Sequence, residues 1–151
     1  MTDLRVVHEA DNPASENPVR RVIATEVEVA DTVISQARGL MFRSSLPEGY
    51  ALVLEVGNGL LARGPSRQRI HMLFVRMPLD VVWLADDEVT KVARMQPWRS
   101  TNAATANRIL ELPAGAAAGV EPGDSVVLET PGGAESGSTS LDTAASLSDD
   151  G

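Results

Sequence analysis

The sequence predicts a mainly β domain, α+β when its elements are counted, shaped as a small barrel with one amphipathic helix and a second short helical turn. Short segments alternate apolar and polar residues with a period of two, which is the period of a half-buried strand. Turn-forming residues recur roughly every ten positions, as they do in small barrels and sandwiches. The chain has 151 residues and only 3% aromatic residues, so we expect one domain with an aliphatic core.

The first half of the folded region is expected to contain three strands and the helix. Residues 23–29 alternate apolar and polar side chains and predict a half-buried strand. Asp31 is placed to cap a helix over residues 33–41, whose apolar positions follow helical spacing. Two further apolar segments, residues 50–56 and 69–75, are expected to form strands.

The second half is expected to contain a hairpin and two more strands. Residues 81–85 and 88–92 flank the pair Asp86-Asp87, which tolerates the unusual dihedral angles of a tight hairpin turn. Residues 96–106 show no clear period and are expected to be irregular, apart from a helical turn. The remaining expected elements are strands over residues 108–112 and 125–129, with the short helical turn between them at PAGAAAG, residues 113–119.

The composition divides the chain into three parts. Residues 1–19 mix acidic, amide, proline and serine residues and predict a flexible N-terminal arm. The β-rich domain is expected to span residues 20–130. Residues 131–151 are rich in Gly, Ser and Thr and include four acids without a base, so they predict a disordered acidic tail.

The charge balance predicts a soluble protein adapted to high salt. Asp and Glu total 21 against 13 Lys and Arg, the net charge is −8, and Lys91 is the only lysine. This pattern favours a halophilic cytoplasm, and a GC-rich genome is the alternative explanation. No signal peptide and no apolar run long enough to span a bilayer is evident, so we expect a cytoplasmic monomer that binds no membrane. The absence of cysteine excludes disulfides and thiolate metal sites.

Four motifs carry a resemblance to a known family. They are IHMLFVRMPLDVVWL at residues 70–84, RGLMFR at 38–43, LELPAG at 110–115 and the Gly123-Asp124 pair. Their order and wording resemble the DUF192 (UPF0127) family, in a form similar to its haloarchaeal members. The resemblance implies a small β-rich domain and carries no particular activity with it. Many family members have a Trp where this chain has His71, which weakens a catalytic role for that imidazole.

The central motif and LELPAG supply the candidate site residues. Asp80 lies between apolar neighbours and needs partners, for which Arg43 and Arg76 are the candidates. It is either a structural carboxylate that accepts backbone hydrogen bonds or a ligand contact. His71 could carry a proton, oriented by Asp80 or Glu111, or could be a strand histidine bonded to backbone. The full set expected to contact a ligand is Arg43, His71, Arg76, Met77, Asp80 and Glu111.

These residues predict a binding module for a small ligand or a protein partner, rather than an enzyme. The first alternative is an enzyme that uses Asp80, Glu111 and His71 as acid and base groups. The second is an anion or RNA binder that uses the basic cluster, for which charge compensation within an acidic protein is the favoured explanation. Neither a metal site nor a cofactor is expected, because no ligand spacing or phosphate loop is present. The cluster comprises Arg63, Arg67, Arg69, Arg76, Lys91, Arg94 and Arg99.

Overall fold

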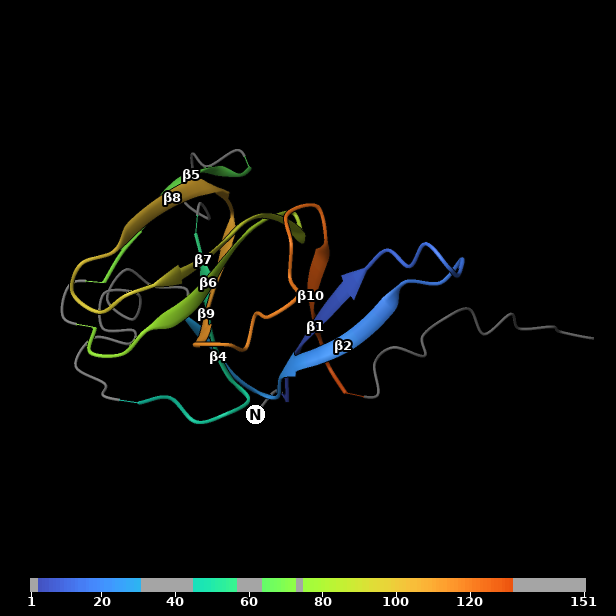
Figure 1. The fold of residues 1–151 in the computed structure, drawn as a ribbon, viewed down its shortest axis with the longest axis horizontal. Coiled ribbons are helices and arrows are strands. Elements are labelled where there is room, and N and C mark those ends of the chain that lie inside the picture. Colours follow the sequence, from blue (N-terminus) through green and yellow to red (C-terminus); the bar gives the residue numbers. More distant parts are fainter. Residues whose placement is uncertain (1–2, 31–44, 57–63, 73–74, 132–151) are drawn as a thin grey trace, which may run out of the picture.

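The computed structural model describes residues 3–30, 45–56, 64–72 and 75–131, which form two β-sheets (Figure 1). All neighbouring strands pair antiparallel except β3 and β4, which are parallel. The two-stranded sheet consists of β5 (Ser66–His71) and β8 (Thr101–Ala106). The eight-stranded sheet runs in the order β2 (Val19–Ala24), β1 (Arg5–Ala10), β10 (Ser125–Glu129), β7 (Glu88–Met95), β6 (Leu79–Ala85), β9 (Arg108–Pro113), β4 (Tyr50–Glu55) and β3 (Glu26–Ala30).

The hairpin expected around Asp86 and Asp87 is confirmed as β6 and β7. Both residues adopt positive φ angles, 49° and 71°, which is the conformation that a two-residue hairpin turn requires. The pairing register shifts between Trp83 and Leu84, so Thr90 on β7 has no direct partner on β6. The Thr90 hydroxyl lies 3.2 Å from the carbonyl oxygen of Trp83 and 2.7 Å from that of Thr105, so its single proton is shared between this bulge and β8.

The two edge strands of the large sheet follow one another in the chain. β2 and β3 are separated by Thr25 alone, so residues 19–30 form first one edge strand of the sheet and then the opposite edge strand. The backbone N–H groups of Thr25 and Glu26 both donate to the carbonyl of Gly49, at 2.9 and 3.0 Å. Gly49 has a φ of +81°, and a Cβ on it would lie 3.4 Å from the Thr25 hydroxyl, so the bend favours glycine there.

The large sheet buries apolar side chains on both faces. One cluster includes Leu79, Val81 and Trp83 and lies between the large sheet and the β5–β8 ribbon. Trp83 Nε1 donates to the carbonyl of Gln68, and the Thr90 hydroxyl donates to the carbonyl of Thr105, so both contacts tie the ribbon to the sheet. The other cluster includes Val82 and Leu84 on the opposite face. Alternation along β6 therefore assigns its side chains to two separate cores.

The predicted fold class is wrong in its helices and its barrel. The described residues contain strands and turns but no helix, and the strand order is open, with β2 and β3 at its edges. The helix expected over residues 33–41 lies outside the described residues. The expected helical turn at 113–119 is a succession of tight turns, because Gly115 and Gly119 adopt φ angles of +96° and +84°, which a right-handed helix does not accommodate.

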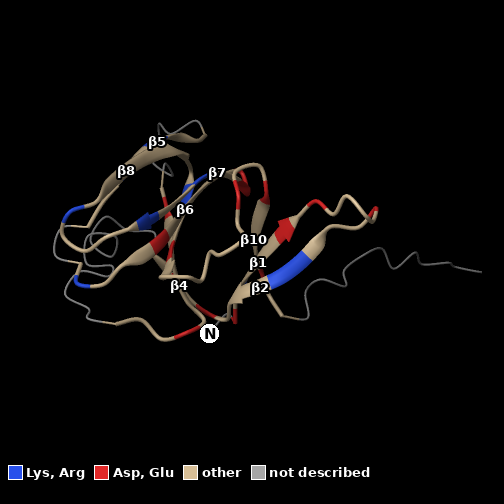
Figure 2. Cartoon of the chain, in the orientation of Figure 1, with Lys and Arg blue, Asp and Glu red and all other residues tan. Residues whose placement is uncertain are grey.

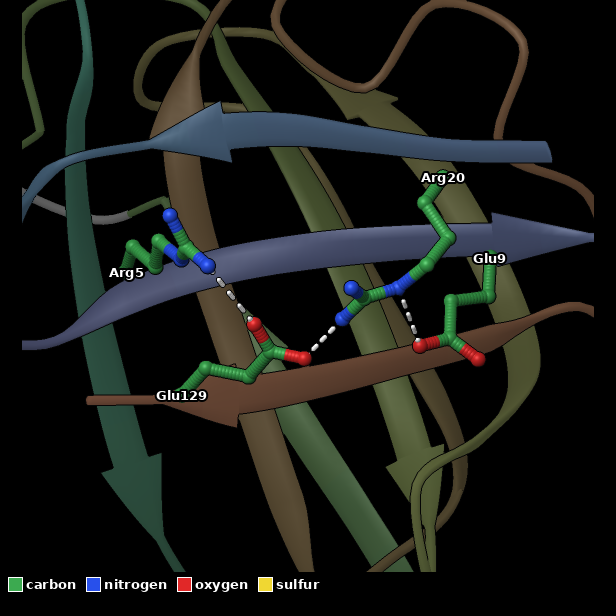
Figure 3. Close-up of polar contacts among 4 residues, drawn as sticks. All are labelled: Arg5, Glu9, Arg20 and Glu129. Carbon is green, nitrogen blue, oxygen red and sulfur yellow. Dashed lines mark hydrogen bonds and ion pairs between the residues drawn. The ribbon is translucent and has the colours of Figure 1, made fainter. Parts of the chain in front are cut away.

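The expectation of a flexible arm over residues 1–19 is corrected for Arg5–Ala10, which form β1 between β2 and β10. Each charged or imidazole side chain of β1 contacts a partner on a neighbouring strand or just before β10. His8 is buried and its Nε2 lies 2.7 Å from Asp124 Oδ2. On the other face, Arg5 contacts Glu129, Arg20 contacts Glu129, and Arg20 contacts Glu9, so an ion-pair chain joins the three strands (Figure 3). The tail predicted at 131–151 lies outside the described residues from 132 onward and stays a prediction.

Candidate functional site

Asp80 is a buried carboxylate with three hydrogen-bond donors around it. Only 5% of the residue is exposed. Arg94, its direct partner on β7, donates from Nε to one carboxylate oxygen. The backbone N–H groups of Gly115 and Ala117 donate to the other oxygen at 2.9 and 3.0 Å. Asp80 therefore anchors the loop after β9 to the sheet, and its carboxylate raises the pKa of Arg94.

The sequence indicates the Asp86-Asp87 hairpin but not its bulge, and the bulge decides which β7 residue stands opposite Asp80. A hairpin without a bulge around Asp86-Asp87 places Ala93 opposite Asp80, whereas the bulge at Thr90 shifts the register and brings Arg94 there. Of the two arginines proposed from the sequence, Arg76 is exposed and forms no hydrogen bond or ion pair with the described residues. The other, Arg43, lies outside those residues.

Glu111 is also buried but has a different environment. It is 9% exposed, and burial raises its pKa to about 7. It stands opposite Leu52 on β4 and Val81 on β6. Desolvation is the one cause of this rise, and no hydrogen bond or charge from a described residue acts on the carboxyl group. A carboxyl group placed this way is held in its neutral form well above the pH at which an exposed glutamate ionises.

Asp80 and Glu111 project from opposite faces of the large sheet. Directly paired residues share a face, so Glu111 shares one with Val81, and Asp80 shares the other with Leu112. Val81 belongs to the cluster under the ribbon and Leu112 to the cluster on the far face. A ligand on one face thus contacts only one of the two carboxyl groups, and the structure does not bring them together.

The other sequence-predicted residues are also dispersed. His71 is exposed at the end of β5, on the small sheet. Met77 is buried in the cluster that faces Glu111, together with Met72 and Met95. An acid–base trio of His71, Asp80 and Glu111 is therefore not assembled by the described residues.

Glu111 lines none of three hollows whose walls consist of described residues. The largest of these three, about 310 Å³, is lined by β2, Gly49 and Ala116. The second, about 300 Å³, is bordered by the hairpin turn and Arg108, which pairs with Glu55 and Asp87. The third, about 170 Å³, lies beside Asp124. Ala116 belongs to the loop that Asp80 anchors, so Asp80 shapes a wall of the largest hollow without entering it.

Within the described ranges, no group of three or more His, Cys, Asp or Glu side chains is arranged to hold a metal ion. The described residues also form no helix that is long and apolar enough to cross a membrane.

Comparison with known proteins identifies the family. A family model for DUF192, described as an uncharacterized ACR, matches residues 15–128. The chain belongs to the DUF192 family. A UPF0127 protein of Thermococcus gammatolerans is 35% identical over 99 residues, which are 63% of this chain and 60% of that protein. The resemblance of the four sequence motifs to DUF192 is therefore confirmed, while the haloarchaeal form remains a prediction.

Two crystal structures share the DUF192 fold of this chain. One is a protein of unknown function from Novosphingobium aromaticivorans, 26% identical, with a TM-score of 0.65 and coverage of 82% of this chain and 83% of that one. The other is described as a putative transcription regulator from Sinorhizobium meliloti, 21% identical, with a TM-score of 0.63 and coverage of 87% and 96%. The second likeness is one of fold alone.

Proposed function

We propose that this DUF192 domain binds a small organic molecule, and that Glu111 holds the polar group of that ligand. The observation that carries the proposal is the contrast between the two buried carboxyl groups. Asp80 accepts bonds from a guanidinium and two backbone amides, which is enough to explain its burial by structure alone. Glu111 is also buried, and no such bond from the described residues acts on it. An uncompensated buried carboxyl group is costly, and such groups gather at binding sites.

The surroundings of Glu111 indicate the chemistry of the ligand. Its face of the sheet is apolar, and the cluster packed there includes Met72, Met77 and Met95. Methionine side chains are flexible and polarizable, so they adapt to apolar ligands of varied shape. A carboxyl group titrating near pH 7 accepts a hydrogen bond from an amine or pairs with an ammonium group once ionised. The proposed ligand is therefore a small apolar molecule with one amine or similar donor.

Thermal unfolding with a panel of alkylamines tests this proposal. Each amine is compared with the alcohol of the same carbon skeleton, at pH 6 and pH 8. We expect amines to raise the melting temperature of the wild-type chain, more at pH 8, where Glu111 is charged. The Glu111→Gln variant should lose this stabilisation, while Glu88→Gln, a control on an exposed position of β7, should keep it. Equal stabilisation of wild type and Glu111→Gln by every amine would contradict the proposal.

A further inference from the structure

The arginines that the structure describes fall into two groups by their partners. Arg5, Arg20, Arg94 and Arg108 each contact a carboxylate, and Arg21 donates to the carbonyl of Ala118. A second group is exposed and has no hydrogen bond or ion pair with any described residue. Charge compensation, the explanation favoured by the sequence, therefore does not account for the second group. Its members are Arg67, Arg69, Arg76 and Arg99.

Two of these arginines form a row on the small sheet. Arg67, Arg69 and His71 are the exposed residues that alternate along β5, so their side chains share its outer face. The row from Arg67 to His71 spans about 13 Å, at ~3.3 Å for each residue. Neither β5 nor β8 contains an acidic residue, and Figure 2 shows no red on either strand. The ribbon is thus a cationic surface on a chain whose net charge is −8.

An exposed tryptophan lies in the turn near the His71 end of this row. The turn before β8 carries Trp98 and Arg99, and the N–H of Trp98 donates to the carbonyl of Met72, directly after His71. Trp98 is 50% exposed, and its φ of +65° is a conformation that costs a non-glycine residue energy. Trp98 has a contact of its own within the chain, and a half-exposed aromatic ring at the end of a cationic row is typical of a recognition surface.

We propose that the outer face of the β5–β8 ribbon, with Trp98 and Arg99 at its end, binds single-stranded RNA. A row of cations follows the phosphate backbone, and an exposed aromatic ring stacks on an unpaired base, which is how proteins hold single strands without sequence preference. Base pairing in a duplex would keep the base edges and faces away from Trp98. Thr101 and Thr105 place exposed hydroxyl groups on the same outer face, opposite His71 and Arg67. These hydroxyls bond the ribose 2′-OH, which favours RNA over DNA.

Fluorescence polarisation with a labelled ten-nucleotide oligouridylate tests this surface in the full-length chain. We expect binding that weakens as KCl is raised. The Arg67→Gln/Arg69→Gln variant should bind at least tenfold more weakly. Its slope of log affinity against log salt should be shallower by about 1.4, since each phosphate contact on a single strand contributes about 0.7. Both positions are exposed on the ribbon, so this variant is expected to fold.

Matched controls separate the effect of the ribbon surface on RNA binding from the effect of the net charge of the chain. Arg5→Gln/Arg20→Gln removes the same charge from β1 and β2, which lie apart from the β5–β8 ribbon (Figure 1), and both arginines are already paired there, so this variant should bind RNA within twofold of the wild type. Arg76→Gln, which lies outside the ribbon, should behave likewise and serves if the first control unfolds. Trp98→Ala should weaken binding and Trp98→Phe should largely restore it.

Three outcomes would overturn the proposal. The first is a wild-type chain that binds no oligouridylate at low salt. The second is an Arg67→Gln/Arg69→Gln variant that binds as tightly as the wild type or as the Arg5→Gln/Arg20→Gln control. The third is oligothymidylate of the same length binding as tightly as the RNA, which would remove the role given to Thr101 and Thr105.

Discussion

Replacing Glu111 by glutamine should stabilise the protein at alkaline pH and have little such effect at acidic pH. Burial raises the Glu111 pKa from 4.5 to about 7, so the folded chain keeps the proton over a range in which the unfolded chain has released it. The protonated Glu111 therefore contributes its full stabilisation below pH 4.5, and this stabilisation is lost as the pH rises from 4.5 through about 7. The difference of roughly 2.5 pKa units corresponds to about 3 kcal/mol.

The variant Glu111→Gln is neutral at every pH and escapes this loss. Urea unfolding of both proteins between pH 5 and pH 8.5 measures the difference in unfolding free energy. The amide shifts the unfolding free energy of the variant by an amount that does not depend on pH. The informative quantity is therefore how the difference between variant and wild type changes with pH. We expect the variant to gain about 2–3 kcal/mol relative to the wild type over this interval. Glu88→Gln, the exposed control, should show a flat difference. A flat difference for Glu111→Gln as well would refute the assignment of Glu111 as a buried, uncompensated carboxyl group.

Three further predictions concern Asp80, the acid excess and the C-terminal segment. Asp80→Asn should lose about 1–3 kcal/mol at neutral pH, because a neutral amide cannot accept from Arg94 and the two loop amides as a carboxylate does; unchanged urea unfolding would show that the loop is held otherwise. Raising KCl from low to molar concentrations should raise the melting temperature, since the acid excess is mostly repulsive, and a flat or falling profile would remove the high-salt interpretation. Deletion of residues 131–151 should leave the melting temperature nearly unchanged; a loss of several degrees would show that they pack on the domain.

The sequence predicts the central strands well because their periodicity is local. Residues 81–85 and 88–92 alternate around a turn pair that favours positive φ, and they form the β6–β7 hairpin as expected. The segment TNAATA has few large apolar residues, so the sequence predicts irregular structure there. It forms β8 because its inner face packs only small alanines against the core. The sequence predicts a flexible arm over the residues of β1 because several of them are polar. In the sheet these polar side chains are paired with residues more than ten positions away.

The candidate site is harder to predict because it depends on register. Asp80 and Glu111 are both recognisable in the sequence as acids within apolar runs. Which face each one occupies follows from the pairing of β6 with β9, and that pairing is set by the whole sheet. The partner of Asp80 likewise depends on one bulged residue, Thr90. No local pattern distinguishes the acid that anchors a loop from the acid left without a partner.

Native mass spectrometry of the protein purified from its own host tests the ligand-binding proposal most directly. Wild type, Glu111→Gln and Glu88→Gln are sprayed from the same volatile buffer and then denatured to release any bound compound. The proposal predicts a small organic adduct on the wild type and on Glu88→Gln that is absent or strongly reduced on Glu111→Gln. A wild-type chain without an adduct, or an adduct retained equally by Glu111→Gln, would contradict it.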